Sequence, residues 1–437
     1  MRTFKLFLIF AIIGIAPAFA QSETYGLKDV FSFKFGNILN GGTVNNSKIK
    51  ELVLREFNSI TPENELKPNA TMVQSGSTDD NIKVALGTGA KAILKFCQDN
   101  NIGVRGHTLV WHGQTPAWFF WEDMTKNTGV LADKETMNKR MESYIKNIFA
   151  LIKSSYPTLN LYAYDVVNEA FENWGGGLRP ASESSWTKIY GSDEYIINAF
   201  TYARKYAPEN CKLFYNDYNE YETNKCNSIY NLAMKLKKDN LIDGIGMQAH
   251  LAIGFPSASS FGSALKKFAS TGLEVQITEI DITVLEENDK REPTVSEYEA
   301  QGRKYRDIIK EVLKYKDQVT AFVVWGPQDN HSWRGWGFPV LFDKNGNKKP
   351  AYHEIFALGT LPNSNPKLQS GNSLKAWVND GQLNVTGVTI GKPWRVYTTT
   401  GVLVHQGVAL SETATAAINM PGIYIIWTEN GTVKVIL

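Results

Sequence analysis

Short apolar segments alternate with longer amphipathic segments along most of this chain, from about residue 28 to residue 360. The short segments have the length and the β-branched or aromatic content of buried strands, and the longer ones repeat their apolar residues with the period of a helix. We expect eight strands, at residues 33–39, 59–62, 104–111, 163–167, 212–217, 244–250, 274–278 and 321–325. This alternation confines the chain to the α/β class.

Eight strands separated by helices predict a closed (β/α)8 barrel, the TIM-barrel architecture. The alternative is an open, doubly wound sheet. That fold carries a glycine-rich phosphate turn after its first strand, and the corresponding segment here, "NILNGGTVNN", lacks the G-x-G-x-x-G spacing. The closed barrel is therefore the favoured fold.

The composition changes near residue 359. Residues 359–373, "GTLPNSNPKLQSGNS", are rich in Pro, Asn, Ser and Gly, as linkers are. Residues 374–437 then alternate apolar and polar side chains between turn signals, which predicts a small β-sandwich. We therefore expect a barrel domain at residues 21–358, a linker at 359–373 and a sandwich domain at 374–437.

Residues 1–20 have the pattern of a secretory signal peptide. Arg2 and Lys5 precede an apolar run at residues 6–16, and Ala18 and Ala20 form a small-x-small cleavage site. The run is too short to cross a bilayer and no later stretch approaches ~18 apolar residues, so we expect no membrane span. Cleavage removes two cations and no anion, which takes the formal charge from +2 to 0. A neutral protein gives no reason to expect nucleic acid as a partner.

Three cysteines, Cys97, Cys211 and Cys226, are too few for a disulfide scaffold, and no C-x-x-C pair indicates a metal site. Cys97 lies in a predicted helix and is expected to be buried. A disulfide between Cys211 and Cys226 remains an open alternative.

Polar and aromatic side chains close seven of the eight predicted strands, and in a (β/α)8 barrel functional groups lie at these carboxyl ends. The side chains are Glu63, Asn64, Lys67, His107, Trp111, His112, Asn168, Glu169, Asn216, Tyr218, Gln248, His250, Glu279, Asp281, Trp325, Trp333 and Trp336. Any one of them has an ordinary explanation as a solvated loop residue or a core residue. Their convergence predicts one polar pocket with aromatic walls.

This set of side chains suits a carbohydrate. The sequence contains neither the H-E-x-x-H metal motif nor the G-x-S-x-G nucleophile motif, and we expect no metal and no other cofactor. Indole rings can stack on sugar rings, and hydrolysis of a glycoside needs two carboxyl groups across the bond. Glu169 and Glu279, on the fourth and seventh predicted strands, would face each other across the mouth of the barrel.

The neighbours of the two glutamates indicate different roles. Glu279 and Asp281 are two apart on one strand and point the same way, so His250 can lie beside both. Such a Glu–His–Asp group would keep Glu279 ionised, as a nucleophile requires. Glu169 precedes apolar residues, a weakly solvated setting that suits a proton donor.

Within residues 26–360 the chain contains, in order, the segments "TPENELKP", "RGHTLVWHGQTPAW", "DVVNEA", "KLFYNDYN", "GIGMQAHL", "QITEIDI" and "WG…SW". Together these seven segments resemble glycoside hydrolase family 10, the retaining β-1,4-xylanases. The resemblance implies a (β/α)8 barrel with Glu169 as acid/base and Glu279 as nucleophile, the latter supported by His250 and Asp281. It further implies that the sugar at the cleavage site is held by Asn168, His107, Lys67, Gln248, Trp325 and Trp333. The neighbouring lining would come from Glu63, Asn64, Trp111 and Tyr218.

Two features depart from the family pattern. Tyr164 stands where the family usually has Trp. In "WGPQDNHSW", Pro327, Gln328 and Asn330 replace commoner residues. This loop would border the cleavage site, so the departure bears on the preferred chain length and not on the chemistry.

The C-terminal part of the chain contains "VYTTTGVLVHQG" and "INMPGIYIIWTENGTVKVIL", the latter including the terminal residues 434–437. These segments resemble the sorting domain of the type IX secretion system. The resemblance implies secretion machinery as a partner and a secreted or cell-surface location. The alternative is a small carbohydrate-binding sandwich.

The sequence thus predicts a secreted, monomeric endo-1,4-β-xylanase that acts with retention on xylan and xylo-oligosaccharides. A retaining β-1,4-glucanase would use the same mechanism. A non-catalytic glycan-binding protein or a structural barrel would not require both Glu169 and Glu279.

Overall fold

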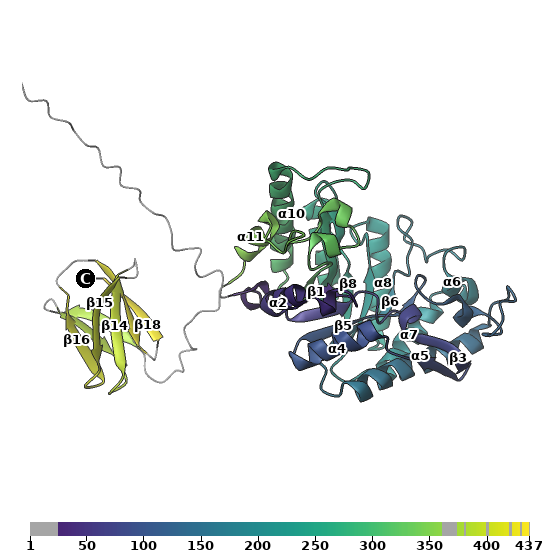
Figure 1. The fold of residues 1–437 in the computed structure, drawn as a ribbon, viewed down its shortest axis with the longest axis horizontal. Coiled ribbons are helices and arrows are strands. Elements are labelled where there is room, and N and C mark those ends of the chain that lie inside the picture. The colour runs from purple at the N-terminus through teal and green to yellow at the C-terminus, as the bar shows by residue number, and fades with distance from the viewer. Residues whose placement is uncertain are drawn as a thin grey trace, which may run out of the picture. The chain divides into compact units, whose positions relative to one another are not determined.

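The computed structural model describes residues 25–360, 374–379, 382–398, 402–418, 422–428 and 431–436. The chain divides into two compact units, Met1–Thr360 and Leu361–Leu437 (Figure 1). The expected signal peptide, at residues 1–20, and nearly all of the expected linker lie outside the described residues.

The first unit contains a closed barrel of eight parallel strands. In barrel order these are β1 (Lys34–Leu39), β2 (Ser59–Pro62), β5 (Gly103–Trp111), β6 (Leu161–Asn168), β7 (Lys212–Asp217), β8 (Gly244–Met247), β10 (Glu274–Thr283) and β11 (Val319–Val324). Strand β11 pairs with both β1 and β10, which closes the sheet on itself. The predicted (β/α)8 barrel is confirmed.

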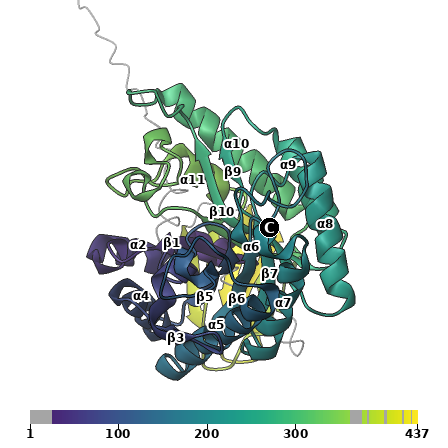
Figure 2. The ribbon, with the colours of Figure 1, turned by 90° about the vertical axis from the view of Figure 1, so that its right-hand side faces the viewer.

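Helices lie between the strands along the chain, and the longer ones form the outer layer of the barrel (Figure 2). The helices are α1 (Leu27–Val30), α2 (Ser47–Glu56), α3 (Pro68–Thr71), α4 (Thr88–Asp99), α5 (Lys134–Ser155), α6 (Ser185–Tyr190), α7 (Glu194–Tyr206), α8 (Thr223–Lys238), α9 (Ala258–Ala269), α10 (Val295–Leu313) and α11 (Pro350–Phe356). Figure 2 shows α8, α9 and α10 along one side of this layer and α2 and α4 on the opposite side. In the described residues, no helix combines the length and apolar character needed to span a membrane.

Helix α10 illustrates how local sequence defines these helices. Its N-terminus carries a capping box, in which the Thr294 hydroxyl accepts the Glu297 N–H and the Glu297 carboxylate accepts the Thr294 N–H at 2.7 Å. Its buried face contains Tyr305, Ile309 and Val312, which have the spacing of one face of a helix.

Two predicted strands differ from the structure near their carboxyl ends. Strand β10 continues to Thr283, beyond its expected end at residue 278, so Glu279 lies within the strand. The expected strand at residues 244–250 breaks after Met247, and the chain resumes as β9 (His250–Ala252), which pairs with the extended part of β10. Between them, Ala249 adopts the left-handed conformation, with φ 60°. A hairpin of β3 (Met72–Thr78) and β4 (Asn81–Val84) was not predicted.

The second unit is a small all-β domain, as predicted. One sheet contains β12 (Lys375–Asn379), β13 (Gln382–Thr386) and β16 (Thr413–Ala417). The other contains β15 (Leu403–Val408), β14 (Pro393–Thr398), β17 (Ile423–Thr428) and β18 (Gly431–Ile436). Leu383 and Val385 from the first sheet share a buried core with Trp394, Val396 and Ile426 from the second. The two sheets therefore form a sandwich.

All three cysteines lie in the first unit, where their thiols are free and buried. The structure therefore contains no disulfide between Cys211 and Cys226.

Two fully buried tyrosines differ in one hydrogen bond. The hydroxyl of Tyr164, on β6, has no hydrogen-bond partner among the described residues, whereas that of Tyr144, on α5, lies 3.0 Å from the Thr71 hydroxyl. We expect Tyr164→Phe to raise the free energy of unfolding by about 1 kcal/mol, because it removes an unpaired buried polar group. The matched control, Tyr144→Phe, should lower it by a similar amount. Urea unfolding measures the free energy of unfolding of both variants. Equal decreases for the two would contradict the difference in hydrogen bonding between Tyr164 and Tyr144.

Candidate active site

A cleft of about 560 Å³ opens at the carboxyl ends of the barrel strands. Its lining consists of Glu63, Asn64, Lys67, His107, Trp111, Gln114, Asn168, Glu169, Tyr218, Gln248, His250, Glu279, Trp325 and Trp333. Most candidate residues named from the sequence lie on this surface. The four exceptions are His112, Asn216, Asp281 and Trp336, of which Asp281 is fully buried directly behind His250. Gln114 was not predicted.

Glu279 projects from β10 with only 5% of its surface exposed. One carboxylate oxygen accepts a hydrogen bond from Asn216 Nδ2 at 2.7 Å, and the other lies 3.4 Å from His250 Nε2. Burial alone would raise the pKa of Glu279, but these hydrogen bonds and the nearby imidazoles of His250 and His107 outweigh it and lower the pKa to about 2. Glu279 is therefore an oriented carboxylate at neutral pH.

His250 lies between two carboxylates. Its Nδ1 is 3.0 Å from Asp281 Oδ2, while its Nε2 faces Glu279. Burial acts to lower the pKa of His250, but the charges and hydrogen bonds of Asp281 and Glu279 raise it to about 10. The ring is therefore an imidazolium that donates from both nitrogens. The structure brings together the Glu–His–Asp group expected from the sequence.

Hydrogen bonds from Trp333 and Arg334 hold the Asp281 carboxylate in place. Its Oδ2 accepts the Trp333 indole N–H at 3.0 Å, and its Oδ1 accepts Arg334 Nη1 at 2.7 Å. Arg334 also donates to the backbone carbonyl of Leu251, on β9. Arg334 was not predicted, although its position directly after Trp333 could have indicated it.

Glu169 follows the end of β6 with an unusual backbone conformation, φ 57°, which non-glycine residues rarely adopt. Hydrogen bonds hold this conformation: the Glu169 N–H donates to the carbonyl of Asn216, and its carbonyl accepts Arg179 Nε. The conformation turns the side chain into the cleft directly beside Asn168.

Three N–H donors surround the Glu169 carboxylate. The Trp111 indole donates at 2.9 Å to one oxygen, and the amides of Asn168 and Gln248 donate to the other at 3.1 and 3.0 Å. The sequence suggested a weakly solvated carboxyl and did not anticipate these donors, because two of them come from distant strands.

A network of amides joins the two glutamates. Asn216 Nδ2, which donates to Glu279, also lies 2.9 Å from Asn168 Oδ1, and Gln248 Nε2 lies 3.2 Å from the same oxygen. The Thr278 hydroxyl donates to Asn216 Oδ1 at 2.6 Å and so fixes the orientation of this amide. Asn216 was recognised as a strand-end residue but not assigned to the site.

His107 is oriented by a buried ion pair inside the barrel. Asp165 accepts hydrogen bonds from Nη1 and Nη2 of Arg105 and lies 2.9 Å from His107 Nδ1. Arg105 also donates to the Gln276 side chain at 2.8 Å. Because Asp165 occupies Nδ1, His107 can offer Nε2 to a ligand in the cleft.

Another part of the cleft is rich in groups that can bind sugar hydroxyls. Lys67 Nζ donates to Asn64 Oδ1 and Gln114 Oε1, both at 2.9 Å, and Glu63 accepts Asn40 Nδ2 at 2.9 Å. Burial lowers the pKa of Lys67 and raises that of Glu63, and their opposite charges partly offset both shifts.

Two indoles form the aromatic wall beside His250. The Trp325 ring lies 5.8 Å from that of His107 and is nearly buried, whereas Trp333 is 59% exposed and lies 5.1 Å from the His250 ring. Trp333 can therefore present its face to a sugar. His112 and Trp336, also named at strand ends, do not line the cleft, and burial beside Arg179 lowers the pKa of His112 to about 4.

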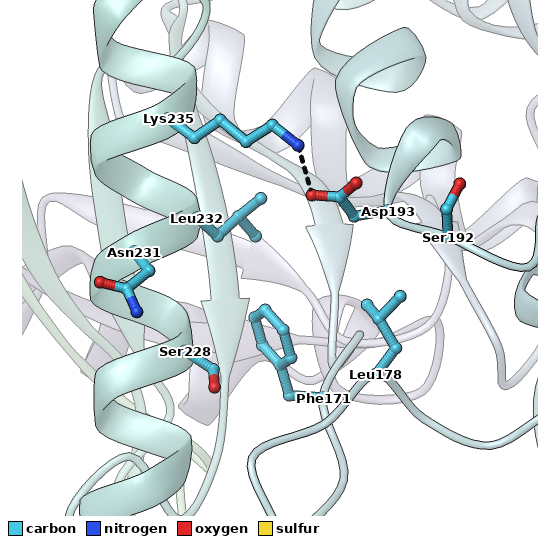
Figure 3. Close-up of a pocket in the computed structure, with 8 residues that line it drawn as sticks. All are labelled: Phe171, Leu178, Ser192, Asp193, Ser228, Asn231, Leu232 and Lys235. Carbon is cyan, nitrogen blue, oxygen red and sulfur yellow. Dashed lines mark hydrogen bonds and ion pairs between the residues drawn. The ribbon is translucent and has the colours of Figure 1, made fainter.

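A second cavity, of about 420 Å³, lies beside α8 (Figure 3). Phe171 and Leu232 line it, and Lys235 pairs with Asp193 across it at 2.7 Å. It contains neither catalytic candidate, so the chemistry belongs to the cleft. Among the described residues, no group of three or more His, Cys, Asp or Glu side chains could hold a metal ion.

The ion pairs of His250 predict a pH dependence of stability. Folding raises the pKa of His250 from 6.5 to about 10, so the stabilisation is complete below pH 6.5 and is lost as the pH rises through about 10. The difference in unfolding free energy between wild type and His250→Asn should therefore shrink over this range. His353, whose pKa burial lowers, is the control, and His353→Asn should show a constant difference above pH 6.5. If the difference in unfolding free energy between wild type and His250→Asn did not change with pH, His250 would not be an imidazolium in the folded protein.

Comparisons with known proteins agree with this geometry. Residues 26–358 match glycosyl hydrolase family 10. The chain is 48% identical to endo-1,4-beta-xylanase Y of Acetivibrio thermocellus, over 76% of this chain and 32% of the relative. It is also 48% identical to the bifunctional endo-1,4-beta-xylanase XylA of Ruminococcus flavefaciens, over 76% of this chain and 34% of that protein. The chain thus spans about a third of the length of these curated relatives.

A solved structure extends the agreement to three dimensions. The CBM22-1–GH10 modules of Clostridium thermocellum endo-1,4-beta-D-xylanase 10B, complexed with xylohexaose, align with a TM-score of 0.72 and 46% identity. The alignment covers 77% of this chain and 68% of that chain. The match to the family model, the sequence relatives and the barrel lead to one conclusion: the chain belongs to glycosyl hydrolase family 10.

Proposed function

We propose that this protein is an endo-1,4-β-xylanase that hydrolyses internal β-1,4-xylosidic bonds with retention of configuration. The observation that carries the proposal is the unequal setting of two carboxylates in one cleft. Glu279 is buried against an imidazolium, and Glu169 is surrounded by neutral N–H donors. The relatives named as endo-1,4-beta-xylanases and the xylohexaose complex support xylan as the substrate.

In the first step, Glu169 donates its proton to the glycosidic oxygen as the bond from that oxygen to the anomeric carbon breaks. A Glu279 oxygen attacks the same carbon from the opposite face and forms a covalent glycosyl-enzyme. Asn216 and His250 hold the attacking carboxylate in a fixed orientation. Retention requires the two carboxyl groups to lie roughly 5–5.5 Å apart, against ~6.5–9.5 Å for inversion.

In the second step, Glu169 is a carboxylate and removes a proton from water as the water oxygen attacks the anomeric carbon. The bond to Glu279 breaks, and the sugar leaves with its original β configuration. Trp111, Asn168 and Gln248 donate hydrogen bonds to the Glu169 oxygens and so fix the orientation of the group that takes up this proton.

Substitution of each glutamate should separate the two roles. Glu169→Ala should slow xylan hydrolysis by roughly 10²–10⁴-fold, because it removes the general acid. It should still react with dinitrophenyl β-xylobioside to form the glycosyl-enzyme, because dinitrophenolate leaves without a proton, and azide should restore turnover. Glu279→Gln should lose activity on both substrates. Steady-state kinetics and burst measurements test this.

A soluble β-1,4-glucan is the control for substrate class. Faster hydrolysis of the glucan than of xylan by the wild type would retain the mechanism and overturn the substrate. Wild-type activity of Glu279→Gln on dinitrophenyl β-xylobioside would overturn the assignment of the nucleophile.

We further propose that the second unit directs export through a type IX secretion system and that residues 1–20 are a signal peptide, which together make the protein secreted or surface-bound. The C-terminal sequence resemblance supports this role, as does the compact sandwich formed by the described part of that unit. Its last strand, β18, pairs along its length with β17.

Truncation tests the role of the second unit. A chain that ends at Thr360 should keep the catalytic efficiency of the full chain on soluble xylan, because every residue of the cleft precedes that point. In a bacterium with type IX machinery, only the full chain should reach the medium or cell surface. Equal export of both chains, with weaker binding of the truncated one to insoluble xylan, would favour a carbohydrate-binding sandwich instead.

A further inference from the structure

One short turn reaches both glutamates of the active site. Gln248, before the turn, donates to Glu169 at 3.0 Å, and His250, after it, faces Glu279. Ala249 links them in the left-handed conformation, which costs a non-glycine residue energy unless its surroundings hold it there. The orientation of the Gln248 and His250 side chains therefore depends on the contacts that hold Ala249 in this conformation.

A buried carboxyl group holds this turn. Glu220, on the connection between β7 and α8, is fully buried, and its Oε1 accepts the backbone N–H of Ala249 at 3.1 Å. Its Oε2 is also buried and has no hydrogen-bond partner among the described residues. On its other side the turn is tied to β10, because the carbonyl of Gln248 accepts the Glu279 N–H at 3.1 Å.

We propose that Glu220 is a positioning residue of the active site, which sets Gln248 and His250 against the two catalytic glutamates through the Ala249 amide. The inference rests on the proposed function for its catalytic consequence. Glu220 does not touch the substrate in this account. It acts only through the geometry of the turn.

The surroundings of Glu220 make a purely space-filling role a poor explanation. Burial raises its pKa to about 7, against the opposing effect of Lys225, and a buried acid with an unpaired oxygen costs stability. The ionisable groups around it are Asp217 on β7, Lys225 and Cys226 on α8, the adjacent Tyr221 and His250 on β9. A leucine would fill the same space without this cost but could not accept the Ala249 N–H.

Three substitutions isolate the acceptor. Glu220→Gln keeps an acceptor oxygen and the length of the side chain. Glu220→Leu keeps the approximate volume without an acceptor. Glu220→Asp keeps the charge but is one methylene shorter, and it serves as the second test if the leucine variant does not fold.

The kinetic measurement is kcat/KM for dinitrophenyl β-xylobioside as a function of pH, since the acid limb for this substrate reports the ionisation of the nucleophile. Glu220→Leu and Glu220→Asp should lose between about 10- and 100-fold in kcat/KM because of misplacement. Their acid limb should also move upward from the wild-type position, because Glu279 loses part of its hydrogen bonding to His250. Glu220→Gln should keep the wild-type limb and most of the activity.

Two results would overturn the inference. One is a Glu220→Leu or Glu220→Asp variant with wild-type kcat/KM and acid limb. The other is a Glu220→Gln variant as impaired as these two. Hydrogen exchange of residues 244–252 gives a test that does not need activity: exchange should quicken in Glu220→Leu and Glu220→Asp but not in Glu220→Gln. If the wild type cleaves neither xylan nor dinitrophenyl β-xylobioside, the proposed function fails, and hydrogen exchange alone decides whether Glu220 holds the turn.

Discussion

The imidazolium of His250, held between Glu279 and Asp281, is the interaction on which the rest of the active site depends. A carboxylate that is 95% buried would ordinarily take up a proton, because burial disfavours charge. The contacts of His250 and Asn216 reverse that preference and leave Glu279 ionised with a fixed orientation. Asp281 keeps the ring charged, and Trp333 and Arg334 hold Asp281 in place. Glu279 therefore has the charge and the fixed orientation that its proposed role as a nucleophile requires.

The barrel makes this arrangement possible because parallel strands bring residues distant in sequence to one rim. The amides of Asn168, Asn216 and Gln248 come from neighbouring strands, or the turn after one, and form a continuous network between Glu169 and Glu279. Deeper in the barrel, the pair of Arg105 and Asp165 orients His107. Each of these polar groups is buried, so each must find a partner, and those partners fix the geometry of the cleft.

The sequence was sufficient to predict the barrel and the group of residues in its mouth, because both depend on regular patterns. Strand and helix periods are local, and the carboxyl ends of barrel strands converge whatever the details of the loops. The break at Ala249 and the continuation of β10 could not be predicted, since both depend on pairing between distant segments. The roles of Asn216 and Glu220 could not be predicted either. Both depend on hydrogen bonds to residues that are distant in the sequence, and such bonds leave no local signal.

The unequal settings of Glu169 and Glu279 are the basis on which we propose a retaining glycosidase. Proton NMR of the products, recorded during the first minutes of xylohexaose hydrolysis by the wild-type protein, tests it most directly. We expect the new reducing ends to appear as the β-anomer and to equilibrate with the α-anomer only later. Products that appear first as the α-anomer would show inversion and would contradict the role of Glu279 as a nucleophile.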